Sequence, residues 1–266
     1  MSSPRFRAHI AGISLWAPTL PGWSAARAVL RGEAAAEAPC PIPAPARLPP
    51  GGRRRAPLTV ALSLAAAEEA VHGSGLRADQ LLAVFASAHG DLPVVDDICR
   101  TLVHTPTMVS PTRFLHSIHN APAGVWSQLE GNRLASTAVS GAQHSFAQGL
   151  TEALVQCEAE QRPVLLVAYD TAAVGALTHT TASRGSLAAA LVLTPQAGPH
   201  TLARLDWAME HSPCDTPTPA TGAAQELRSN AMAPALPLFE ALAVQRPTSL
   251  AWPLSPFHSL RLSLAG

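Results

Sequence analysis

The stretch Gly131-Asn-Arg-Leu-Ala-Ser-Thr-Ala-Val-Ser-Gly-Ala-Gln-His-Ser-Phe146 contains the feature that decides the fold. Residues 136–140 have the pattern of a short strand, and the small residues Gly141 and Ala142 lead directly into a helical pattern that starts near Gln143. A side chain on such a tight strand-to-helix turn lies close to the unpaired N–H groups at the start of the helix, which carry a partial positive charge. Many enzymes hold a nucleophile there, but Gln143 carries an amide without a titratable proton.

Strand-like and helix-like segments alternate along the rest of the chain, which indicates an α/β layered fold with helices on a sheet. Strands are expected over residues 9–16, 81–86, 136–140, 164–169, 187–193, 202–209 and 259–264. Helices are expected over residues 23–31, 58–71, 94–104, 121–129, 143–158 and 236–244.

Composition and charge exclude several classes of function. The chain of 266 residues is 47% apolar and 14% charged, which is enough for a buried core, and its formal net charge is zero. Without a bulk charge, neither nucleic acid nor an anionic membrane surface is an expected partner. Residues 164–177 are the longest apolar candidate for a membrane span, and Asp170 interrupts them, so no membrane insertion is expected. The N-terminal residues lack a secretory signal pattern, and we expect a cytoplasmic protein.

Cysteines and histidines give no metal-site pattern. His116 and His119 are three residues apart, but no acidic or cysteine partner lies at ligand spacing, so no metal is assigned. The absence of a Cys-x-x-Cys pair argues against a zinc site and against a disulfide framework. The four cysteines, expected as reduced thiols, are Cys40, Cys99, Cys157 and Cys214.

Residues 39–57 form a proline-rich segment that contains seven prolines and the run Arg53-Arg54-Arg55. This composition does not pack a core, and we expect an exposed loop inside the domain. The three arginines are either simply solvated or a docking patch for an acidic partner, and the sequence leaves both interpretations open.

The motifs, taken in order, resemble the β-ketoacyl synthases of the thiolase superfamily over roughly residues 5–195. In that family the pattern Gly-Pro-Ser-x-x-x-Ser/Thr-Thr-Ala-Cys-Ser-Ser leads to the active-site cysteine at the start of a buried helix. Ser136 and Ser140 fall on serine or threonine positions, Ala142 falls on the alanine, and Gln143 falls on the cysteine. Further matches are Ser110-Pro111, His119-Asn120 with Gly124, and the strand-like residues 184–193.

The resemblance implies a thiolase-like layered fold of the α-β-α-β-α type with a truncated C-terminal half. Residues 1–195 would form the ketosynthase-like N-terminal half, and residues 196–266 a reduced C-terminal remnant of the same domain. The active enzymes also need two histidines from their C-terminal half, in Gly-Thr-x-Thr-like and Gly-His-Thr-like contexts. The histidines present after residue 195 lack these contexts: His200, His211 and His258.

A ketosynthase-like chain with glutamine at the nucleophile position resembles the chain-length-factor subunits of type II polyketide systems, most closely the small subunits of bacterial aryl polyene clusters. The resemblance implies a non-catalytic subunit that forms a heterodimer with an active β-ketoacyl-ACP synthase and helps to shape the chain tunnel. Substrates bound to acyl carrier protein would be handled by the partner, so no cofactor is expected here. The helix at residues 121–129 and the strand at residues 136–140 are where the family forms its dimer.

Two other functions remain open from the sequence. One is a stand-alone acyltransferase or thioesterase-like member of the superfamily that acts on acyl-ACP or acyl-CoA. It would use Ser140 or Ser145 with His144 as the base, although no orienting acid is close in sequence. The other is a homodimeric module that binds acyl carrier protein. A thiol nucleophile at Cys214 is disfavoured, because its proline-rich surroundings indicate an exposed loop.

Overall fold

The computed structural model describes residues 6–181 and 183–265, and within these residues the strands form a single mixed sheet. The sheet has nine strands in the order β4-β3-β5-β6-β1-β7-β9-β8, with β2 paired to β1. The strands are β1 (Phe6–Ala17), β2 (Leu20–Pro21), β3 (Leu82–Ala86), β4 (Ser136–Val139), β5 (Val164–Asp170), β6 (Leu187–Thr194), β7 (Ala203–Glu210), β8 (Thr248–Pro253) and β9 (Ser259–Ala265). The α-helices are α1 (Trp23–Leu30), α2 (Pro50–Arg55), α3 (Leu58–Ser74), α4 (Leu92–His104), α5 (Pro111–Ser117), α6 (Ala121–Glu130), α7 (Ser145–Glu160), α8 (Gly222–Glu226) and α9 (Leu236–Val244).

Strand β5 lies in the interior of the sheet, and the burial of its side chains shows that helices cover both faces of the sheet. It pairs in parallel with β3 and antiparallel with β6, and each of its residues is buried. Leu166 belongs to the core on one face of the sheet, and Leu165 belongs to the core on the other. A continuous apolar run of this kind is typical of a strand covered on both faces. The sheet therefore lies between two helical layers.

A β-bulge in β1 changes which residues of that strand face each layer. Ile10 pairs with Leu193 and Gly12 pairs with Val192, so β1 has one extra residue relative to β6. Because side chains alternate along a strand, an extra residue reverses the alternation beyond the bulge. Ile10 before the bulge and Ile13 after it consequently face the same core.

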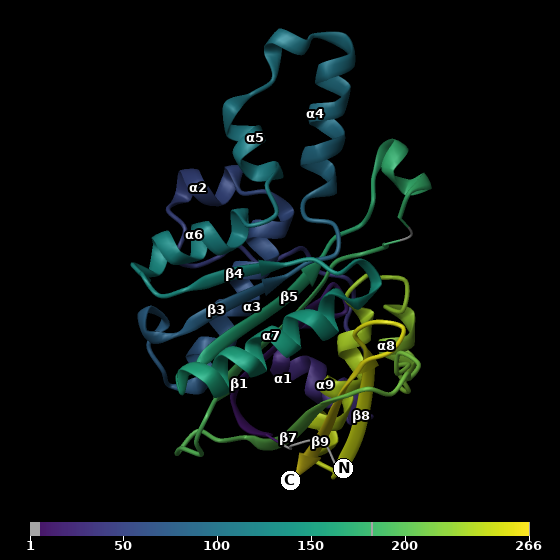
Figure 1. The fold of residues 1–266 in the computed structure, drawn as a ribbon. Coiled ribbons are helices and arrows are strands. Elements are labelled where there is room, and N and C mark those ends of the chain that lie inside the picture. Colours follow the sequence, from purple (N-terminus) through teal and green to yellow (C-terminus); the bar gives the residue numbers. More distant parts are fainter. Residues whose placement is uncertain (1–5, 182, 266) are drawn as a thin grey trace.

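Two glycines allow helices to approach the sheet closely. A Cβ atom on Gly12 would collide with the carbonyl oxygen of Ala70 in α3, and one on Gly149 in α7 would lie 2.5 Å from the Cβ of Ala86 in β3. Helices α3 and α6 cover one face of the sheet, and α1, α7 and α9 cover the other (Figure 1). The α7 helix, which follows the strand-to-helix turn, is thus held directly against the sheet.

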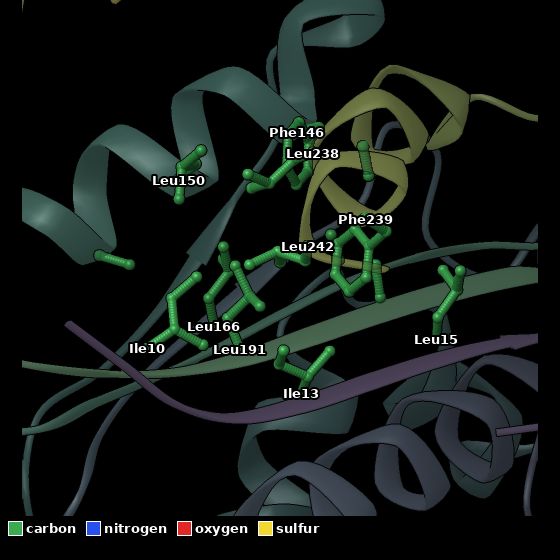
Figure 2. Close-up of a cluster of buried hydrophobic side chains, with 14 of the residues drawn as sticks. Ile10, Ile13, Leu15, Phe146, Leu150, Leu166, Leu191, Leu238, Phe239 and Leu242 are labelled. Atoms are coloured by element: carbon green, nitrogen blue, oxygen red, sulfur yellow. The ribbon is translucent and has the colours of Figure 1, made fainter. Parts of the chain in front are cut away.

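The larger core lies between the sheet and helices α7 and α9 (Figure 2). Phe146 and Leu150 come from α7, Phe239 comes from α9, and Ile10 comes from β1. Burial of a large apolar side chain stabilises a fold by about 1.5–3 kcal/mol. This core therefore fixes the position of α7, and with it the position of the turn that precedes the helix.

The last three strands extend the sheet beyond β1 and approach α7. Strand β7 pairs with the first residues of β1, and β9 and β8 follow it. The ring centroids of Trp252 in β8 and Phe146 in α7 are 5.8 Å apart, and the Trp252 indole N–H donates to the Pro234 carbonyl oxygen over 2.8 Å. The expected α/β layered fold is confirmed, but in the described residues it has three layers, one sheet between two helical layers, and not the five layers of the α-β-α-β-α type. The C-terminal strands are continuous with the main sheet, and the expected boundary at residue 195 stays a prediction.

Most expected elements are present within a few residues of their predicted ends. Helix α7 begins at Ser145 rather than at residue 143, because residues Ala142–His144 form a 3₁₀ turn. Helix α4 begins at Leu92, since the Asp91 carboxylate accepts a 2.9 Å hydrogen bond from the Val94 N–H and caps it there. The sequence analysis did not identify α5, α8 or β8, and α2 lies inside the expected loop of residues 39–57.

Helices α4 and α5 form an arm, residues 92–117, that projects beyond the end of the sheet (Figure 1). The two helices pack on each other, and an ion pair of 2.6 Å joins Arg113 in α5 to Asp97 in α4. Only Leu92 and Asp96 of α4 are buried, and no residue of α5 is buried. The arm is thus attached to the body mainly at its base.

Candidate functional site

The turn between β4 and α7 has the geometry that the sequence indicated. Ala142 has a φ of 50°, a left-handed conformation that is unusual for a residue other than glycine. The Gly141 N–H donates to the Ser145 hydroxyl oxygen over 2.9 Å, and the Ser145 hydroxyl donates to the Ala142 carbonyl oxygen over 2.7 Å. These two bonds hold a sharp turn at the N-terminus of α7.

Gln143, at the position where the resemblance places the nucleophile, is exposed to solvent. Its side-chain Nε2 lies 3.3 Å from the ring Nε2 of His144. The amide nitrogen can only donate, so this contact requires the imidazole nitrogen to be the acceptor. An amide in this position can form hydrogen bonds but cannot carry an acyl group as a thioester.

The two candidate serines direct their hydroxyl groups to the backbone. Ser140 is exposed and donates to the Ala88 carbonyl oxygen over 3.2 Å. Ser145 is fully buried and is occupied by the turn described above. His144 contacts Gln143, so the structure gives neither serine a bond to the histidine that the hydrolytic interpretation needs.

A buried carboxylate organises the residues beside this turn. Asp170, at the end of β5, is fully buried and accepts hydrogen bonds from the Ser87 hydroxyl and the Ala88 N–H, both at 2.8 Å. The His89 N–H donates to it over 3.3 Å. The loop after β3 therefore wraps around the Asp170 carboxylate, and Ser140 is joined to the same loop through Ala88.

Two side chains from distant parts of the chain, His119 and Thr181, reach this loop. His119 Nε2 lies 2.8 Å from the Ser87 carbonyl oxygen, so this nitrogen is protonated and donates. His89 Nε2 lies 2.7 Å from the Thr181 hydroxyl. The base of the arm, the end of β3 and the loop at Thr181 are thus joined by imidazole hydrogen bonds.

The electrostatics of this cluster follow from burial. Burial raises the pKa of the Asp170 carboxyl to about 6, although the donors from Ala88, Ser87 and His89 act in the opposite direction. Burial lowers the pKa of His89, and the nearby His119 adds to the lowering. A lowered pKa keeps the His89 ring neutral near pH 7, so it can accept the Thr181 hydroxyl proton as a hydrogen bond.

The C-terminal histidines lie in two places. His200 packs against Gly75, just after α3. His211 and His258 have ring centroids 4.9 Å apart, and the turn that carries His258 is near α7, since Gln148 Nε2 donates to the Leu254 carbonyl oxygen over 3.5 Å. Residues 6–181 and 183–265 contain no cluster of three or more His, Cys, Asp or Glu side chains arranged to hold a metal ion.

The four cysteines are free thiols in the structure, and they lie in different environments. Cys157 is buried in the core between α7 and the sheet, and burial raises its pKa to about 12. Cys214 lies in a segment without regular secondary structure, as the sequence analysis expected.

The fold is that of a ketosynthase-like protein, and Gln143 lies where the sequence resemblance places the nucleophile. A family model described as "Beta-ketoacyl synthase, N-terminal domain" matches residues 23–252. The chain belongs to this family. The match extends past residue 195, where the sequence resemblance was expected to end, and so includes most of the C-terminal strands.

Solved structures with a similar fold come from ketosynthase systems. One is a ketosynthase (ApeO) in complex with its chain length factor (ApeC) from Xenorhabdus doucetiae, with a TM-score of 0.73 and 21% identity over 97% of this chain and 99% of the matched chain. Another is the ishigamide ketosynthase/chain length factor, with a TM-score of 0.72 and 16% identity over 97% and 99%. A third is AntDE:AntF, a type II PKS acyl-carrier protein in complex with its ketosynthase bound to the hexaketide, with a TM-score of 0.74 and 12% identity over 98% and 99%. A comparison with curated protein sequences found no match.

In the part of the chain that the structure describes, every helix is too short or too polar to cross a bilayer.

Proposed function

We propose that this chain is a non-catalytic, chain-length-factor-type subunit that pairs with an active β-ketoacyl-ACP synthase and helps to shape its chain tunnel. The observation that carries the proposal is Gln143 on a retained elbow. The left-handed Ala142 and the two Ser145 hydrogen bonds preserve the turn, while the side chain on it cannot form a thioester. A fold that keeps the elbow but not the nucleophile favours an architectural role.

The edge of the sheet supports pairing with another subunit. Strand β4 is at the end of the strand order and pairs only with β3 among the described residues, so its other edge is open. Open strand edges present unpaired N–H and C=O groups and favour pairing with another chain. Helix α6 contacts β4, and both segments are those where the resemblance places the family's dimer interface.

Two of the three arginines of α2 support a second contact, which would be made with acyl carrier protein. Arg53 donates to the carbonyl oxygens of Ala46 and Leu48, which fixes the segment. Arg54 and Arg55 are exposed, and no salt bridge among the described residues involves them. Free exposed cations of this kind favour encounter with an acidic surface. We infer that the docking interpretation of this run is the better one.

Co-purification of this chain with a candidate partner β-ketoacyl-ACP synthase tests the proposal. We expect a stable heterodimer, with condensing activity that depends on the cysteine of the partner. The isolated chain should release no thiol from acyl-ACP or acyl-CoA. Thiol release by the isolated chain that Ser140→Ala abolishes would instead establish the acyltransferase or thioesterase-like alternative. A stable homodimer that binds acyl carrier protein and ignores the ketosynthase would support the homodimeric module.

A further inference from the structure

A cavity of about 330 Å³ lies among helices α1 and α9 and strands β1, β7 and β9. It forms where β1 has no neighbouring strand on the edge opposite β6, because β7 pairs with β1 only as far as Ile10 and β2 pairs with it only from Trp16. Ile13 lies in the middle of this gap and lines the cavity. Figure 2 shows α9, which carries Leu242, over this part of β1. The cavity therefore follows from the topology of the sheet.

The lining of this cavity is mainly apolar. Ile13, Leu242 and Leu264 are buried members of the core, and Trp23 is half-buried. Leu202 also lines the cavity and is 48% exposed. Sites for small molecules are typically concave and apolar, with a few polar groups that orient the ligand. Since a cavity of about 150 Å³ holds one benzene molecule, this one has room for roughly a dozen carbon-sized atoms. Its size and lining fit a short hydrocarbon chain.

Arg27, in the last turn of α1, contributes a charged group to this apolar lining. The residue is half-buried, and no salt bridge among the described residues involves it. A charge that is partly removed from water has lost hydration that only an opposite charge or good hydrogen bonds can replace. The Arg27 guanidinium therefore favours a ligand that brings an anionic group into the cavity.

The carboxylates near Arg27 have other partners. Arg27 also lines a second hollow, which contains Glu33 and Glu69. Glu33 forms an ion pair of 2.9 Å with Arg31. Glu69 accepts a 2.7 Å hydrogen bond from the Trp23 N–H and another from a serine hydroxyl of β1. Both carboxylates are thus engaged, and the Arg27 guanidinium is available to an external anion.

We propose that this cavity binds a small amphipathic carboxylate, with its apolar chain against Ile13 and Leu242 and its carboxylate paired with Arg27. A guanidinium matches a carboxylate through two parallel hydrogen bonds. The side-chain amide of Gln245, in the same lining, can donate a further one. The lining residues lie outside the turn at Gln143 and outside β4, so the inference does not depend on the proposed function.

An NMR titration of the full chain with octanoate tests the site. We expect saturable binding of one equivalent with a Kd of roughly 1 mM or tighter, and shifts of the methyl signals of Ile13 and Leu242. Arg27→Gln should raise Kd roughly tenfold, because it removes the charged partner of the carboxylate. Octanol keeps the chain but has no charge, and it should bind the unsubstituted protein roughly tenfold more weakly than octanoate does.

Two further variants make the test specific. Gln245→Glu keeps the size of an exposed side chain and adds a carboxylate to the lining, so it should raise Kd for octanoate roughly fivefold by repulsion, whatever Arg27→Gln does to stability. Arg228→Gln removes an exposed arginine outside the cavity and should change Kd less than about twofold. Equal binding of octanoate and octanol, an equal effect of Arg27→Gln and Arg228→Gln, or binding that does not saturate would each overturn the site. None of these results would affect the proposed pairing with a ketosynthase.

Discussion

The carboxylate of Asp170, at the end of β5, accepts a 2.8 Å hydrogen bond from the hydroxyl of Ser87, at the end of β3. The two residues are 83 positions apart in sequence. Ala88, the residue after Ser87, accepts a hydrogen bond from the Ser140 hydroxyl, and this bond connects the pair to the turn that carries Gln143. The loop that bears His89 is therefore organised by a charge buried behind it. This relationship makes the corner of the sheet sensitive to the protonation of one carboxyl group.

The buried Asp170 predicts a specific dependence of stability on pH. Its folded-state pKa of about 6 is above the ordinary value of 3.8, so between these values the folded protein holds a proton that the unfolded chain releases. The protonated Asp170 carboxyl therefore makes its full contribution to the free energy of unfolding at a pH below its unfolded-state pKa. This contribution, roughly 3 kcal/mol in total, is lost as the pH rises through its folded-state pKa. Urea unfolding at several pH values should show this loss. Because an amide does not titrate, Asp170→Asn should lack it, and an identical pH profile for both proteins would contradict the assignment.

The close approach of α7 to β3 predicts that Gly149→Ala is destabilising. The new Cβ would lie 2.5 Å from the Cβ of Ala86, and α7 cannot move outward without loosening the core around Phe146. We expect a loss of about 1–3 kcal/mol in the free energy of unfolding. Gly124→Ala in α6 is the matched control, since nothing lies within 4 Å of its added Cβ. It should stabilise by about 0.5–1 kcal/mol, and equal effects of the two substitutions would argue against the packing explanation.

The exposure of Gln143 predicts that Gln143→Ala leaves the heterodimer intact. Its side chain contacts His144 and makes no contribution to the core, so the free energy of unfolding should change by less than about 0.5 kcal/mol. Size-exclusion chromatography of the co-expressed subunits measures the complex. Loss of the complex in this variant would mean that Gln143 itself contacts the partner, and the role proposed for the vacated position would be wrong.

The free arginines of α2 predict a salt-dependent contact with acyl carrier protein. Arg54→Glu combined with Arg55→Glu should weaken binding of the carrier protein to the complex roughly tenfold at low ionic strength, and less at high ionic strength. Isothermal titration calorimetry at two salt concentrations measures both effects. Arg228→Glu combined with Arg246→Glu gives the same change in net charge at other exposed positions and serves as the control. Equal weakening by both pairs would indicate a general charge effect and not a docking patch.

The sequence was sufficient for elements whose own residues determine them. The apolar run of residues 164–169 indicated the strand β5, and the small residues before Gln143 indicated the strand-to-helix turn. Short elements were missed because they carry too little periodicity. Helix α5 has seven residues and no buried face, and β8 has six residues and ends in a proline. Their conformations depend on contacts with neighbouring elements.

The polar cluster beside the turn shows where sequence reasoning stopped. Asp170 was noted only as an interruption of an apolar run, and His119 only for its spacing from His116 and for a motif match with Asn120 and Gly124. A buried carboxylate is stable only if donors surround it, and those donors come from a loop more than 80 positions away. His89 and Thr181 gave no local signal, because their contact exists only when the loops after β3 and β5 meet.

The sequence by itself determined the family type of this chain, because the turn motif and the glutamine at Gln143 are contiguous, and residue identity there decides whether a thioester can form. The tertiary structure decided what surrounds that position. It brought Asp170, Ser87 and His89 together, continued the main sheet into the C-terminal strands, and left the β4 edge without a paired strand among the described residues. Burial and exposure depend on which distant segments pack against each other, and no local pattern of residues specifies that.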